Sequence, residues 1–144
     1  MRGAGRAVKK PASLRAAIES AVPDLAIDKD RLLAFIDNGS IVSTGAPSRS
    51  FEWRYTMNLL ITDYAGDPNI LWSALLDWVR VNQSALLDAH SLHEQIRFEV
   101  DILADDKVDL DIKLPLTENV LAGFDDDGRP TVEATDEPTP TWMT

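Results

Sequence analysis

The clearest pattern in the chain is a long alternation of apolar and polar side chains. From residue 51 to residue 62, every odd position is aromatic or aliphatic, and the even positions are polar apart from Leu60. Because successive side chains of a β-strand point to opposite faces, this pattern predicts a strand with one buried and one solvated face. The strand is about twice the usual length, as expected of one that projects beyond its own domain.

Three further stretches carry strand signals. Residues 96–102 and 108–116 alternate around a turn at 104–107, and residues 120–124 predict a short edge strand. Asn38-Gly39 lies between apolar residues 32–36 and 41–43, which predicts a hairpin, since a type I′ turn needs positive φ at both central positions. The apolar positions of the 96–116 hairpin are expected to face the core: Ile96, Phe98, Val100, Ile102, Val108, Leu110, Ile112, Leu114 and Leu116.

Two segments have the periodicity of amphipathic helices. Residues 11–21 show helical spacing and end before Pro23. Residues 69–82 present a broad apolar face, with Asp67 placed to cap the helix and Pro68 at its first position. Together these elements predict an α+β fold, with a mostly antiparallel sheet of about five strands and two helices on one face.

Composition divides the chain into three parts. The 144 residues fit one domain with short tails, and 44% of them are hydrophobic. We expect a flexible basic arm at residues 1–9, the α+β domain at 10–122 and an acidic tail rich in Pro and Thr at 123–144. The chain has no cysteine, no secretory signal pattern and no apolar run long enough to span a membrane, so we expect no disulfide, a reducing compartment and no membrane partner.

The net charge of −10 is unevenly distributed. Residues 1–99 carry 11 positive and 12 negative side chains, whereas residues 100–144 carry 3 and 12. Phosphate binding by the last third is therefore disfavoured, because affinity for nucleic acid comes mainly from Lys and Arg.

Part of this acid forms a band on the polar side of the 96–116 hairpin: Glu99, Asp101, Asp109 and Asp111. Pairing symmetric about the turn sets Glu99 opposite Asp111, which is destabilising, whereas a two-residue shift pairs Glu99 with Lys113. In either register the band is a solvated face or a surface that meets or repels charge.

Motifs for catalysis, cofactors or metals are scarce. There is no Gly-rich phosphate loop and no nucleophile elbow. His90 and His93 are three residues apart in an irregular stretch, and two solvated histidines are the expected interpretation. Residues 125–128 lack the ligand spacing of an EF-hand. We therefore expect no enzyme activity, no cofactor and no metal.

Partner binding is the remaining class of function. Trp142 lies in a tail that has no core to enter, and such aromatics often anchor in a partner's pocket. Together with Arg49 and Arg54 it is a candidate partner-binding residue.

The chain also resembles a known family, the tail completion protein R family of P2-like contractile-tailed phages. The resemblance covers residues 9–120, and no single motif in it is diagnostic. The residues that carry it, in order, are Lys10-Pro11, Leu14-Arg15, Phe35-Ile36-Asp37-Asn38-Gly39, Val42, Thr44-Gly45-Ala46, Phe51-Glu52, Tyr55-Thr56, Asn58-Leu59, Thr62-Asp63, Gly66-Asp67-Pro68, Trp78-Val79-Arg80, Asn82-Gln83, Phe98-Glu99-Val100-Asp101-Ile102-Leu103, Asp109 and Leu116-Thr117-Glu118.

This resemblance implies a virion structural protein at the head-proximal end of the tail, assembled in the host cytoplasm. Such proteins cap the tail tube, stop its polymerisation and provide a head-joining surface, and the wider terminator class forms six-membered rings. The implied partners are copies of the same chain, the tube protein, and possible sheath and neck proteins. DNA passes through such a ring without specific binding.

The overlong strands fit such a ring, because they allow a sheet to continue across a subunit boundary. The acidic residues Glu99, Asp101, Asp109 and Asp111 are then candidates for the channel wall. Two alternatives stay open: another tail, baseplate or tail-derived secretion subunit, and a small hydrolase or metal enzyme that uses His90 and His93.

Overall fold

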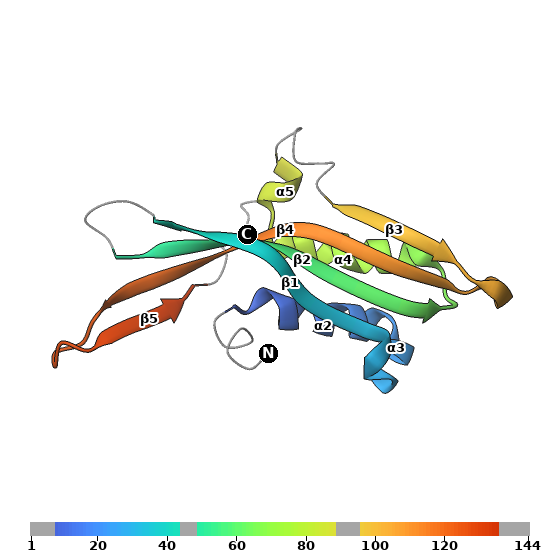
Figure 1. The fold of residues 1–144 in the computed structure, drawn as a ribbon, viewed down its shortest axis with the longest axis horizontal. Helices are drawn as coiled ribbons and strands as arrows, with labels where there is room; N and C mark the ends of the chain where they lie inside the picture. The colour runs from blue at the N-terminus through green and yellow to red at the C-terminus, as the bar shows by residue number, and fades with distance from the viewer. Residues whose placement is uncertain (1–7, 44–48, 89–95, 136–144) are drawn as a thin grey trace.

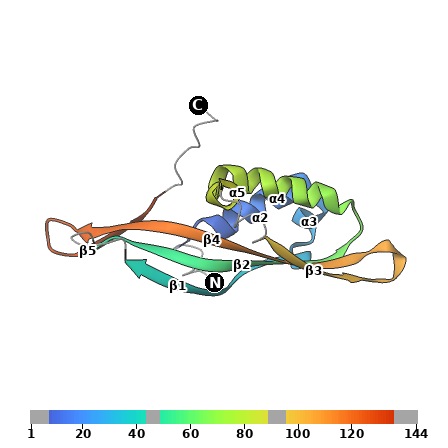
Figure 2. The same cartoon turned by 90° about the horizontal axis from the view of Figure 1, so that it is seen from above.

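The computed structural model describes residues 8–43, 49–88 and 96–135. Figures 1 and 2 show a long antiparallel sheet with its helices gathered on one face, so the α+β fold is confirmed. We call the helix-free side of the sheet the outer face. No helix in the described ranges is both long and apolar enough to cross a bilayer.

The sheet contains five strands in the order β1-β2-β4-β3, with β5 paired to the far end of β4. Every pairing is antiparallel. The strands are β1 (Leu32–Ser43), β2 (Phe51–Tyr64), β3 (Arg97–Ile102), β4 (Val108–Phe124) and β5 (Pro130–Ala134).

The helical layer consists of two main helices and several short ones. α2 (Lys10–Ala21) and α4 (Pro68–Asn82) pack against each other, and the Trp78 indole N–H donates to the Ser13 hydroxyl at 2.9 Å. The short helices of this layer are α3 (Pro23–Ile27), η1 (Lys29–Arg31) and α5 (Ala85–Asp88), and η3 (Ala104–Asp106) lies in the turn between β3 and β4.

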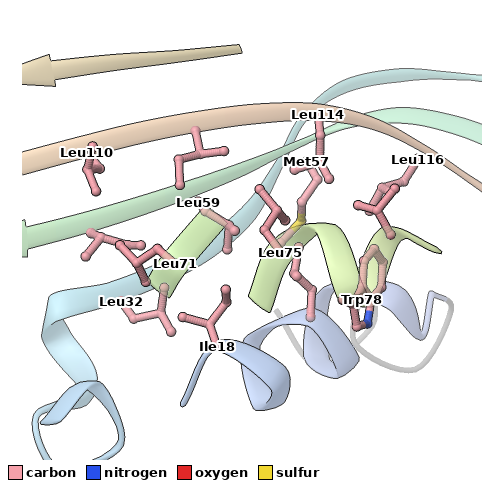
Figure 3. Packing of buried hydrophobic residues seen from close by; sticks show 14 of the residues in the cluster. Ile18, Leu32, Met57, Leu59, Leu71, Leu75, Trp78, Leu110, Leu114 and Leu116 are labelled. Atoms are coloured by element: carbon pink, nitrogen blue, oxygen red, sulfur yellow. The ribbon is translucent and has the colours of Figure 1, made fainter. Parts of the chain in front are cut away.

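The core lies between this layer and the sheet (Figure 3). The alternation predicted for residues 51–62 is confirmed, because Tyr55, Met57, Leu59 and Ile61 are buried on the helix side. The predicted start of the second helix is also confirmed, since the Asp67 carboxylate accepts from the Asn69 N–H at 2.9 Å. α4 buries Leu71, Leu75, Trp78 and Val79 against the strands.

The hairpin predicted at Asn38-Gly39 is wrong, because β1 runs through both residues. The register with β2 shifts between Ile36 and Asn38, so a β-bulge accommodates the extra residue. Glycine is required here by close approach, since a Cβ at position 39 would lie 2.6 Å from the Arg54 carbonyl oxygen. Asn-Gly is compatible with a turn, but here the absence of a Cβ at position 39 lets β2 pack closely against β1.

The separate edge strand predicted at residues 120–124 is also wrong. These residues continue β4, which is 17 residues long, and the Phe51 end of β2 pairs with Val120. Residues 130–134 then return as β5, within the segment whose composition indicated a tail. β5 is exposed along most of its length, so it is held by backbone pairing and not by a core, and hydrophobic patterning did not reveal it.

Strand β3 differs from its predicted burial. Phe98, Val100 and Ile102 do lie on the helix side of the sheet, opposite Ile112, Leu110 and Val108. All six residues of β3 are nevertheless exposed, so the prediction that its apolar residues face the core is wrong. The alternation gives the face of a strand, but only the lateral reach of the helices decides whether that face is covered.

Candidate assembly surfaces

The acidic band lies on the outer face of the sheet, at the end where β3 pairs with β4. Glu99 is opposite Asp111, and Asp101 is opposite Asp109, so the symmetric register is the one adopted. Arg97 and Lys113 form the next pair along the ladder. The structure therefore brings the four predicted acids together, with like charges directly opposed.

Two of these acids are held by neighbouring polar groups. Asp111 accepts from the amide of Asn58 at 2.8 Å, and Asp109 accepts from the Asp63 N–H at 2.9 Å. Asn58 is only 4% exposed, although it lies on the outer face. These hydrogen bonds fix the β4 carboxylates in place, while Glu99 and Asp101 on β3 project from the rim of the same face.

A second surface lies on the helix side of β3, and we call it the β3 edge patch. It consists of Phe98, Val100 and Ile102 on β3 with Trp72 and Leu76 on α4. The rings of Trp72 and Phe98 are 5.1 Å apart, and Leu76 follows Trp72 on the same side of the helix. Ile102 is 83% exposed. A contiguous apolar patch beside an unpaired strand marks an interaction site.

Two arms project beyond the helical layer (Figure 1). One is formed by residues 38–43 with 51–56, and the other by residues 121–124 with β5. The loop end of the first arm contacts the second arm, because the Ser50 hydroxyl accepts from the Ala122 N–H at 3.2 Å. The Arg49 guanidinium carbon also lies 4.4 Å from the centre of the Phe124 ring, a cation–π contact.

Two of the three predicted partner-binding residues, Arg49 and Arg54, fall on these arms. Arg49 links the arms, and Arg54 is exposed on the first arm, where its Nε lies 2.6 Å from a Glu52 carboxylate oxygen. Trp142 lies outside the described residues, as do His90 and His93. Within the described ranges, no three His, Cys, Asp or Glu side chains are grouped as a metal site would require.

A buried polar cluster between α2 and the sheet was missed by the sequence analysis. Glu118 is 3% exposed and accepts from the Lys9 N–H at 2.6 Å, the Lys10 N–H at 3.4 Å and the Tyr55 hydroxyl at 2.7 Å. Burial, together with Glu118, raises the pKa of Tyr55 far above its usual value. The alternation of the strand contained this signal, because Glu118 lies two residues from both Leu116 and Val120 and therefore shares their apolar face.

Gln83 extends this cluster to the open side of β4. Its side-chain oxygen accepts from the buried Lys10 ammonium at 2.6 Å and from the Thr117 N–H at 3.0 Å. Its amide donates to the Thr117 hydroxyl at 3.0 Å. Thr117 lies on β4 between the ranges paired with β3 and with β5, so Gln83 satisfies a backbone group that neither of these two strands reaches.

Comparison with known proteins gives one consistent result. No solved structure matches the chain. The tail completion protein R of Escherichia phage P2 is 42% identical over 132 residues, which cover 91% of this chain and 84% of that protein. The family model described as P2 phage tail completion protein R (GpR) matches residues 8–140. The family model and this relative agree along nearly the whole chain, and the chain belongs to the P2 phage tail completion protein R family.

Proposed function

We propose that this protein completes the phage tail by capping the tail tube as a ring, which stops tube growth and gives the head a joining surface. A role in phage tail completion, as a structural component of the virion, follows from family membership. The six-membered ring, the capping and the head-proximal position are our proposal.

The observation that carries this proposal is the asymmetry of the sheet. One face carries α2, α3, α4 and α5, whereas the opposite face has no described helix and collects Glu99, Asp101, Asp109 and Asp111 at one end. In a ring whose subunits point their helices away from the axis, the helix-free outer face of each sheet lines the channel. Carboxylates there repel DNA phosphates at close range, within a Debye length of about 8 Å at physiological salt. The genome then passes without binding.

The arms supply surfaces for the other components. Residues 38–43 and β5 extend past the helices, where they are free to reach along the tail axis to the tube protein or to sheath and neck proteins. Arg49 and Arg54 lie on these arms, and with Trp142 they are the residues we propose for partner contacts.

Deletion of the gene from a phage or prophage tests this function. We expect free, DNA-filled heads together with headless or overlong tails in electron micrographs of the lysate. Supplying the chain in trans restores normal particles, which controls for effects on neighbouring genes. Normal virions from the deletion would refute the proposal.

A further inference from the structure

The sheet has two open edges that face in opposite directions across the molecule. β1 forms one edge, and β3 forms the other (Figure 1). Each presents a row of backbone groups that no described strand pairs. An exposed strand edge with apolar side chains is a template for pairing with another chain.

Strand direction favours a second copy of this chain. β1 is antiparallel to β2, β2 to β4 and β4 to β3, so β3 runs antiparallel to β1. A neighbour placed side by side in the same orientation therefore brings its β1 antiparallel to this β3. The strands of the two copies then form one continuous antiparallel sheet, and the helices of both copies lie on the same side of it.

The side-chain rows continue in the same way. Leu32, Ile61, Leu110 and Val100 lie in one row across the four strands on the helix side. The next row contains Ala34 at the β1 edge and Phe98 at the β3 edge. Without stagger, the neighbour's small Ala34 lies beside Phe98, and its Leu32 lies beside Val100. Phe98 then has an apolar side chain of the neighbour beside it, whereas Leu32 is fully buried within its own subunit and adds no exposed surface to the contact.

The charges limit pairing of β3 with β3. Two antiparallel registers keep the apolar residues on one face and pair all but one residue of β3. One sets Glu99 opposite Asp101 in both strands, and the other sets Glu99 opposite Glu99 but brings Arg97 opposite Asp101. Like charges opposed in this way are destabilising, and β3 already faces two acids on β4. The β1 edge brings Leu33 and Phe35 to the outer face instead, and its Asp37 is paired with Lys113 at 3.4 Å.

We infer that the β3 edge and its patch bind the β1 edge of a second copy of this chain, in a head-to-tail contact. This inference rests on the proposed ring and names its subunit interface. A heterologous contact of this kind closes into a ring when its rotation divides the circle. The right-handed twist between neighbouring strands provides a rotation at each boundary.

Disulfide cross-linking tests the contact directly, because the chain contains no native cysteine. The variants are Glu99→Cys on β3 and, on the outer face of β1, Leu33→Cys, Phe35→Cys or Ser40→Cys to sample register. Each β1 change is combined with Glu99→Cys in one chain. The proteins are tested purified and in tails assembled in the complemented deletion strain.

A ladder of disulfide-linked oligomers is expected from at least one double variant, while each single variant stays uncross-linked. Disulfide dimers of Glu99→Cys alone would show β3–β3 pairing and overturn the inference. Assembled tails that contain the protein but give no ladder with any pair would overturn it as well.

A charge placed in the patch gives an independent test. Ile102→Lys and Ile27→Lys change side chains that are both 83% exposed, so neither burdens the folded subunit. Ile102→Lys should abolish oligomers and tail completion, whereas Ile27→Lys, outside the patch, should preserve both. Equal behaviour of the two variants would contradict the interface. If the cross-linking and charge tests fail but the deletion gives defective tails, the interface is wrong and the proposed function stands. If the cross-linked ladder forms but the deletion gives normal virions, only the proposed function is contradicted.

Discussion

At the scale of single residues, Glu118 is a buried carboxylate that accepts three hydrogen bonds. Its carboxylate accepts two backbone N–H groups at the start of α2 and one tyrosine hydroxyl. It thereby ties the first helix to the central strand β4, at a helix start where the N-cap residue Lys9 makes no side-chain capping hydrogen bond. Negative charge at a helix N-terminus is also favoured by the helix dipole.

Replacing this carboxylate by an amide should lower stability. Glu118→Gln keeps the volume but turns an –NH₂ group toward donors, so we expect a loss of about 1–3 kcal/mol in the free energy of unfolding. Urea denaturation at one protein concentration measures it. Glu133→Gln on exposed β5 is the matched control, with an expected change within about 0.5 kcal/mol. Identical midpoints for the two variants would contradict the role of Glu118.

We expect Tyr55 to make the free energy of unfolding decrease at alkaline pH. Its pKa is raised in the folded state, first by burial and then by the Glu118 carboxylate, so the folded protein keeps the phenol proton longer than the unfolded chain does. Stability from this group is therefore complete below the unfolded pKa of about 10 and is lost as pH rises beyond it. Tyr64 adds to the same trend, because burial and then Asp67 raise its pKa.

Tyr55→Phe isolates this contribution. The variant should be less stable at pH 7, by about 0.5–1.5 kcal/mol for the lost hydrogen bond, and should lose less of its stability between pH 9 and about 11. Thermal or urea unfolding across this range measures both quantities. A slope equal to that of the unmodified protein would show that Tyr55 does not control the alkaline limit.

At the scale of elements, the length of the strands is the dominant feature. β1, β2 and β4 have 12, 14 and 17 residues, so each extends past the helices and enters an arm. Their pairing in the arms relies on backbone contacts and close approach more than on a core. Of the two glycines in the arm strands, Gly39 lies closer to its neighbouring strand than Gly123 does.

Gly39→Ala should weaken the first arm and lower stability. Its Cβ would lie 2.6 Å from the Arg54 carbonyl oxygen and 2.9 Å from the Tyr55 Cβ, which forces β1 and β2 apart at a cost of about 1–3 kcal/mol. Gly123→Ala is the control on β4, because its Cβ would meet only the Thr131 hydroxyl at 3.6 Å. The control should be neutral or more stable by up to about 1 kcal/mol. Hydrogen exchange of β1 amides locates the effect.

Prediction of the elements succeeded where a periodic face meets a core. β2 and α4 were predicted close to their observed bounds, because each buries one complete face. β5 and the bulge in β1 were not predicted, because backbone pairing between segments distant in sequence determines them and leaves no period in side-chain polarity. The hairpin predicted from Asn38-Gly39 was wrong for the same reason, because pairing with the distant strand β2 keeps both residues within β1.

At the scale of the whole molecule, the two faces of the sheet have different tasks. The helix side builds the core, and the outer face carries the acidic band that we propose for the channel wall. Opposed carboxylates lower the stability of the β3–β4 pair. Their presence is explained if the repulsion acts on DNA in the assembled ring.

A charge reversal tests the channel wall. In Asp101→Lys the new ammonium faces Asp109, so we expect a folded subunit and tails of normal length. DNA release from the assembled particles should slow, and it should slow most at low salt, because the lysines now attract phosphates. Asp77→Lys, an equal charge change on the exposed side of α4, should release DNA normally. Equal release from both variants would place Asp101 away from the channel.

The sequence by itself determined the fold class, the central strand, the capped helix and the acidic band, because each is written in the local order of apolar and polar side chains. The structure alone decided that Asn38-Gly39 stays within a strand, that Glu118 is buried, and that the apolar side of β3 is uncovered. These outcomes depend on which distant segments lie beside one another and how far the helices reach over the sheet. Alternation fixes the face on which a side chain lies, and tertiary packing fixes what that face meets.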